Sequence, residues 1–99
     1  MRRYRMLVLR RREGEALIIG SDIVRFLHIG PDLVDGTCTD MAGNCMTWSA
    51  EPNRQGAQLL KVGRATLFLK AFGSDGTIQV AIDAPRDVSL IREEITQLE

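Results

Sequence analysis

The sequence lacks the residues from which disulfide-rich and metal-binding proteins are built. Its 99 residues include one histidine and two cysteines. Cys38 and Cys45 are too few for a disulfide framework, and His28 cannot complete a four-ligand zinc site with them. We therefore expect both thiols to be reduced and no metal to be bound.

Long hydrophobic runs are missing as well. The basic start MRRYR is followed by an apolar stretch that Arg10 interrupts, so it has neither signal-peptide nor membrane-spanning length. The chain also contains no Ser/His/Asp set and no phosphate-cradling loop. These absences predict a cytoplasmic protein with no membrane segment, no cofactor and no enzymatic activity.

The charges balance to a formal net charge of zero, but they are unevenly distributed. Six arginines precede the first acidic residue, Glu13, whereas the rest of the chain leans acidic. A chain of 99 residues is one domain near the size at which oligomerisation commonly adds stability. We therefore expect a dimer with one basic end.

The stretch MLVLRRREGEALIIG, residues 6–20, predicts a β-hairpin. Residues 7–9 and 16–19 are short apolar blocks with β-branched members, and Gly14 can supply positive φ in the connection. Because side chains alternate along a strand, the three consecutive arginines should point to both faces of the sheet edge.

The middle of the chain is expected to be mostly extended. Residues 21–30 favour a strand, although Ser21 or Asp22 could also cap a short helix. Residues 37–48 predict a small hairpin with a turn at Gly43 and Asn44. Residues 51–63 are polar and contain Pro52 and Gly56, so we expect a loop with one helical turn at most.

The C-terminal third gives the clearest pattern. Residues 65–72 and 77–82 predict a hairpin in which Ile78, Val80 and Ile82 alternate as in a half-buried strand. Pro85 ends it, because proline cannot donate to a β-ladder. Residues 88–91 predict a last short strand, and REEITQLE, residues 92–99, a short helix. The fold class is therefore mainly β.

Two motifs resemble one known family. MLVLRRREGEALIIG and APRDVSLIREEI, at opposite ends of the chain, are similar to the opening and closing motifs of the CsrA/RsmA family of bacterial post-transcriptional regulators. The resemblance covers residues 6–22 and roughly 64–98. It implies a five-stranded, intertwined, strand-swapped homodimer, in which the first strand of one subunit runs beside the last strand of the other.

The resemblance also implies a function, which is translational regulation through RNA that presents GGA in a hairpin loop or a single strand. Basic residues from both chain ends would then converge on one patch, and Arg92 is the strongest candidate contact, because an arginine can pair with phosphate or a guanine edge bidentately. The residues carried over, with their arginine neighbours, are Leu9, Arg10, Arg11, Arg12, Ala84, Pro85, Arg86, Val88, Leu90 and Arg92.

The sequence departs from the family pattern at Arg10, Glu13, Gln79 and Ala81, and most of all in residues 23–63. These residues form an insertion of about 40 residues. We expect the insertion to be an appended β-rich lobe that leaves the family core intact. A second function class therefore stays open, a protein-interaction module that docks a partner through the insertion or the C-terminal helix. It would show as an exposed apolar patch on the insertion with scattered arginines.

Each candidate also has a purely structural explanation. Three arginines at a strand end can be a solvated edge that prevents aggregation. Arg92 with the two glutamates after it can begin a helix, where acidic groups suit the helix dipole. Trp48 can stack on a base, but a single tryptophan in a small insertion is more often part of the core.

Overall fold

The computed structural model describes residues 4–52, 58–73 and 75–92, and this part of the chain is built of β-strands without a helix. The expectation of a mainly β protein is confirmed. The C-terminal helix was predicted for residues 92–99; Arg92 is instead the last residue of a strand, and residues 93–99 lie outside the described residues. The strands are β1 (Tyr4–Arg11), β2 (Ala16–Ile19), β3 (Asp22–Ile29), β4 (Val34–Thr39), β5 (Cys45–Ala50), β6 (Gln58–Val62), β7 (Ala65–Phe72), β8 (Ile78–Pro85) and β9 (Leu90–Arg92).

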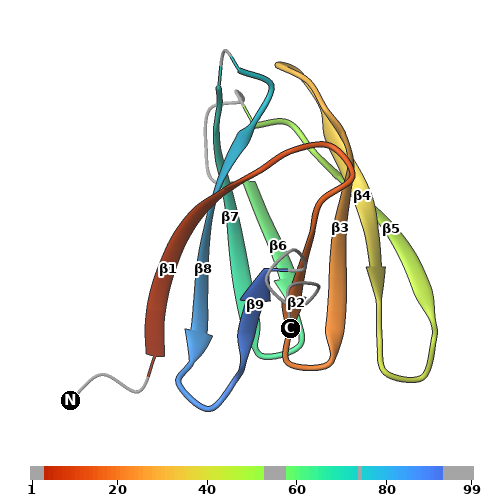
Figure 1. Ribbon diagram of the computed structural model, residues 1–99, viewed down its shortest axis with the longest axis vertical. Helices are drawn as coiled ribbons and strands as arrows, with labels where there is room; N and C mark the ends of the chain where they lie inside the picture. The colour runs from red at the N-terminus through yellow and green to blue at the C-terminus, as the bar shows by residue number, and fades with distance from the viewer. Residues whose placement is uncertain (1–3, 53–57, 74, 93–99) are drawn as a thin grey trace.

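The strands form two antiparallel sheets that pack face to face (Figure 1). Sheet A has the order β1-β8-β7-β6, and sheet B has the order β5-β4-β3-β2-β9. Apolar side chains from both sheets meet in one buried cluster. Ile78, Val80 and Ile82 are fully buried, which confirms the predicted alternation along β8.

The predicted pairing of the first two strands is wrong. β1 pairs along its whole length with β8, from Tyr4 opposite Pro85 to Arg11 opposite Ile78, while β2 pairs with β3 and β9. Residues 12–15, which we call the arch, carry the chain from sheet A to sheet B (Figure 1). Two consecutive apolar strands can thus bury their inner faces in one core from opposite sheets, without pairing with each other.

The insertion is not an appended lobe, so this expectation is also wrong. β3, β4 and β5 extend sheet B, and β6 is the edge of sheet A. Val24, Phe26 and Val34 are completely buried in the same cluster as the residues of β8. The pairing of β3 with β2 explains this integration, because without β3 the edge of β2 that faces away from β9 would have no sheet partner for its backbone groups.

Three segments of the insertion have their own predicted structure. The strand at residues 21–30 and the hairpin at 37–48 are confirmed as β3 and as the β4–β5 pair. The loop predicted for residues 51–63 is wrong in its second half, where β6 pairs with β7. Pro52 and Gly56 precede this strand, and Val62, only 3% exposed, anchors it in the core.

Trp48 is half-buried and packs against the core of the sandwich, which agrees with the structural role favoured from the sequence. Its ring meets Phe26 edge to face with centroids 5.3 Å apart, and its Nε1 donates to the Thr37 carbonyl at 3.0 Å. Gly36 makes room for it, since a Cβ there would lie 2.7 Å from the indole and 2.0 Å from the Arg25 carbonyl oxygen. Any side chain at Gly36 would therefore push β3 and β5 away from β4.

Candidate nucleic-acid interface

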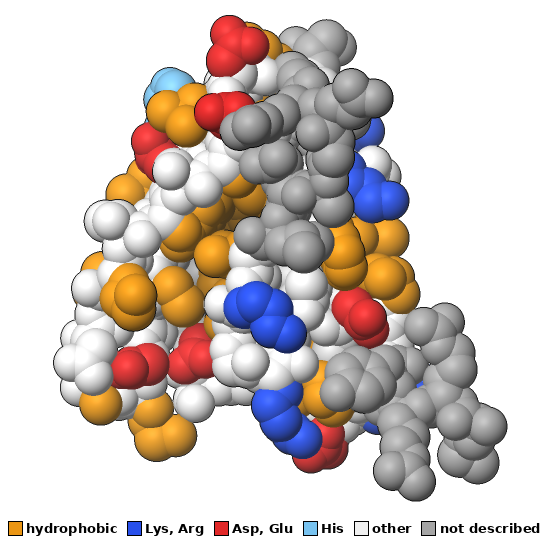
Figure 2. All heavy atoms as spheres, turned by 180° about the vertical axis from the view of Figure 1, so that it is seen from behind, with side chains coloured by type: hydrophobic (Ala, Val, Ile, Leu, Met, Phe, Trp, Pro, Cys, Tyr) orange, Lys and Arg blue, Asp and Glu red, His pale blue; other side chains and the backbone are white. Residues whose placement is uncertain are grey.

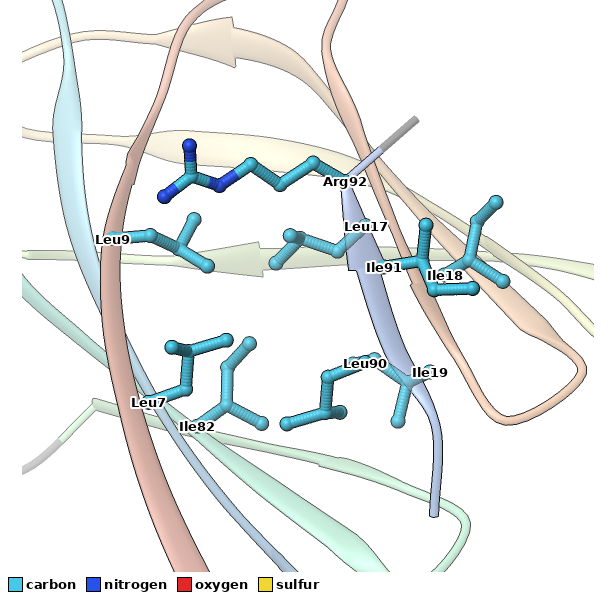
Figure 3. Close-up of a pocket in the computed structure, with 9 residues that line it drawn as sticks. All are labelled: Leu7, Leu9, Leu17, Ile18, Ile19, Ile82, Leu90, Ile91 and Arg92. Atoms are coloured by element: carbon cyan, nitrogen blue, oxygen red, sulfur yellow. The ribbon is translucent and has the colours of Figure 1, made fainter. Parts of the chain in front are cut away.

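The first and last strands face each other across an open groove. β1 ends sheet A and β9 ends sheet B, so in the described part of the chain each has one edge without a sheet neighbour. Both edges lie on the same side of the sandwich (Figures 1 and 3). The space between them, which we call the β1–β9 groove, has a volume of about 420 Å³. Its lining residues are Leu7, Leu9, Leu17, Ile18, Ile19, Ile82, Leu90, Ile91 and Arg92.

The groove is aliphatic except at one end. Figure 3 shows Leu7 and Leu9 on β1 pointing toward Leu17 and Leu90 on the other side, while Arg92 extends over the groove toward Leu9. Leu90 and Arg92 therefore share the inner face of β9, as period-two alternation requires. The stem of Arg92 can pack along this apolar surface while its guanidinium reaches solvent.

Arg11 follows Leu9 on the same face of β1, but its side chain is not presented on the surface. The residue is 2% exposed; its Nε donates to the Arg10 carbonyl at 2.8 Å and its Nη1 to the Ala16 carbonyl at 3.0 Å. The carboxylate of Glu15 lies 3.9 Å from its Nε. This side chain satisfies backbone acceptors on both sides of the arch, so it ties β1 to β2.

The arch itself is fixed to β3 by hydrogen bonds. The Glu13 carboxylate accepts from the Ile29 backbone N–H at 2.9 Å, and the Gly14 N–H donates to the Phe26 carbonyl at 2.6 Å. Glu15 accepts from the Arg12 N–H at 2.7 Å. The register of β3 shifts between Phe26 and His28, so Glu13 satisfies a donor just after this irregularity. Glu13 therefore has a structural role that its departure from the family pattern did not suggest.

Arg5 connects the other end of β1 to the chain segment that precedes β9. Its Nη2 donates to the Val88 carbonyl at 2.7 Å, which connects β1 to the loop between β8 and β9. In that loop Asp87 accepts from Arg64 at 2.7 Å, and this hydrogen bond holds the pKa of Asp87 below its usual value. Arg5 was not among the predicted site residues. The sequence offers a signal for Arg5, because alternation along the strand places it on the same face as Leu7, Leu9 and Arg11.

The predicted site residues differ in exposure. Val88 and Leu90 are half-buried, and the arginines other than Arg11 are exposed. Only Leu9, Leu90 and Arg92 line the groove together. The buried predicted residues are Leu9, Arg11, Ala84 and Pro85.

Arg10 lies on the other face of sheet A. Its Nη1 donates to the Thr77 hydroxyl at 3.1 Å, beside Asp75, whose pKa is lowered chiefly by the Thr77 hydrogen bond. The face of the molecule seen in Figure 2 has basic and acidic side chains interspersed. Arg10, Arg11 and Arg92 thus occupy three different environments and do not form one basic patch.

Other ligand classes find little support in the described residues. There, no group of three or more His, Cys, Asp and Glu side chains could hold a metal ion. Cys38 and Cys45 are free, and burial, with Asp22 and Asp40 nearby, raises the pKa of the Cys38 thiol. We also find no helix in this part of the chain with the length and hydrophobicity of a transmembrane span.

Comparison with known proteins gives no assignment: no family model matches the chain, and neither a curated protein nor a solved structure matches it significantly.

Proposed function

We propose that the protein is a cytoplasmic RNA-binding regulator of translation that recognises GGA in a hairpin loop or a single strand at the β1–β9 groove. It does so without a cofactor or a catalytic step. The main support is the convergence of the two family-like motifs. They lie at opposite ends of the sequence, yet their strands β1 and β9 flank one groove, with Arg92 extending toward Leu9.

The chemistry of the groove suits recognition by hydrogen bonds. The outer edges of β1 and β9, which have no sheet neighbour among the described strands, carry backbone donors and acceptors that can pair with the exposed edges of unstacked bases. Arg92 can bind the O6 and N7 of a guanine, or a phosphate, bidentately. No aromatic side chain lines the groove among the described residues, so stacking contributes little to this mode.

Three departures from the family pattern lie away from the groove. Arg10 is opposite Gln79, and Ala81 is opposite Val8, on the outer face of sheet A. Val8 is 49% exposed there, whereas Leu9 faces the core. The extra charge at Arg10 is therefore not expected to alter base recognition in the groove.

The first prediction is preferential binding of GGA. We expect the protein to bind a short RNA hairpin with GGA in its loop more tightly than the same hairpin with CCA, because phosphate contacts alone carry no sequence preference. Both RNAs should be titrated at the same stated salt concentration, since the phosphate contribution falls as salt rises. Equal affinities would refute specific recognition.

The homodimer is a further part of the proposal. Within the described ranges β1 pairs with β8 alone, which is far along the chain, and the four residues of the arch connect it to β2. If β1 moves to the β8 of a second copy, the same pairs form between chains and each groove keeps its residues. Such an exchange fits a short connection between two sheets.

The second prediction tests this exchange. If folding and dimerisation are one transition, the midpoint of thermal unfolding should rise when the protein concentration is raised a hundredfold, because mass action favours the dimer. Circular dichroism measures the midpoint of thermal unfolding, and sedimentation measures the mass of the protein in solution. A monomeric mass with a constant midpoint would mean that β1 pairs within its own chain in solution.

One observation favours the alternative of a protein-interaction module. Several large apolar side chains of the insertion are exposed, led by Met41 at 80% and Met46 at 72%. Together with the separated arginines, this is the arrangement expected for partner docking. If neither the GGA nor the CCA hairpin binds even at low salt, this alternative becomes the better proposal.

A further inference from the structure

The β1–β9 groove has the features of a small-molecule site. Its volume of about 420 Å³ falls within the range of roughly 300–1,000 Å³ typical of ligand pockets. Its walls come from both sheets, and they leave aliphatic area in contact with water: Leu7 is 37% exposed and Leu90 is half-buried. A ligand that covers these side chains would gain the hydrophobic free energy that the folded chain forgoes.

The polarity of the groove indicates the chemical class of the ligand. The eight lining residues other than Arg92 are leucine or isoleucine, so the body of the ligand should be aliphatic rather than aromatic. Among the described lining residues Arg92 is the only charged one, and it lies at one end of the groove, where it extends toward Leu9. A guanidinium offers five N–H donors in a planar fork that matches a carboxylate. The groove therefore complements an alkyl chain that ends in a carboxylate.

We propose that the groove binds a free, medium-length linear alkyl carboxylate, with the chain between Leu7 and Leu90 and the carboxylate on Arg92. The site itself follows from this geometry. Its regulatory meaning rests on the proposed function: a bound carboxylate occupies the guanidinium that RNA would use, so ligand and GGA RNA compete. The protein would then release RNA when such carboxylates accumulate.

Calorimetric titration with hexanoate, octanoate, 1-octanol and octylamine, below micelle-forming concentrations, tests the site. Each added methylene should tighten the dissociation constant about fourfold until the groove is full. Octanoate should bind about fivefold more tightly than octanol, because its carboxylate forms an exposed ion pair with Arg92. Octylamine should bind most weakly, because its positive charge is repelled by Arg92. Equal binding of octanoate and octanol would overturn the proposal.

Variants assign the binding to the groove. Arg92→Met keeps an apolar stem and should abolish the preference for octanoate over octanol. Lys61→Met, on the exposed edge strand β6 of sheet A, should leave it unchanged. Leu7→Glu, at a half-exposed position, should weaken octanoate binding more than octanol binding. If the Arg92 variant keeps the preference, the carboxylate does not bind there and the proposal fails.

A competition experiment separates this proposal from the RNA function. Saturating octanoate should weaken GGA hairpin binding by the wild-type protein, and octylamine should not. RNA binding that is specific but insensitive to bound octanoate overturns the competition and leaves the RNA function standing. Arg92-dependent octanoate binding without any GGA preference supports the site and refutes the RNA function. No calorimetric signal, together with unshifted NMR methyl signals of Leu7, Leu9 and Leu90, would overturn the ligand site.

Discussion

The strands β1 and β9 both belong to family-like motifs, but the arginines at their ends have opposite environments. Arg11, the last residue of β1, is 2% exposed, and its guanidinium donates to backbone carbonyls of Arg10 and Ala16. Arg92, at the end of β9, is exposed and extends over the groove. A run of arginines is therefore not in itself a binding surface, because some of the guanidinium N–H groups can be hydrogen-bonded to backbone carbonyls.

The largest effect that would sharpen this comparison is on stability. Arg11→Ala should lower the free energy of unfolding by about 2–4 kcal/mol, because the buried Ala16 carbonyl and the part-buried Arg10 carbonyl lose the guanidinium donor. Arg92→Ala should change it by less than about 0.5 kcal/mol, as is usual for exposed positions. Urea denaturation of both variants measures the difference. Equal losses would show that the two arginines have the same structural importance.

A smaller effect is expected within the arch. Glu13→Ala removes the acceptor for the Ile29 N–H and should destabilise the fold by about 1 kcal/mol. Glu13→Gln keeps a carbonyl oxygen at this place and should lose less. The same denaturation experiment compares the two variants. If glutamine is as harmful as alanine, the negative charge rather than the hydrogen bond fixes the arch.

The sequence predicted strands better than it predicted their partners. Alternation along β8 depends only on the residues of that strand, so Ile78, Val80 and Ile82 were identified correctly. The pairing of β1 with β8 depends on contacts between distant segments, and a short turn after an apolar block favours the nearer partner. The strand β6 does not follow from the composition of residues 51–63, because Pro52 and Gly56, which precede it, favour a loop.

The candidate site was predictable in part for the same reason. The alternation of side chains along a strand correctly predicts that Leu90 and Arg92 share one face of β9, because alternation depends only on neighbouring residues. It could not show that Arg11 is buried, because its partners are carbonyls placed by the turn from sheet A to sheet B. Nor could it show the groove, which exists only because β1 and β9 end two different sheets.

The most direct test of the central claim compares Arg92→Ala with Lys61→Ala in binding to the GGA and CCA hairpins at one salt concentration. Both changes remove one positive charge from an exposed side chain, but only Arg92 lines the groove. Arg92→Ala should weaken GGA binding by about 1–3 kcal/mol and reduce the preference for GGA over CCA, as loss of a bidentate base contact does. Lys61→Ala should leave this preference unchanged. Equal effects of the two changes on both RNAs would contradict base recognition in the β1–β9 groove.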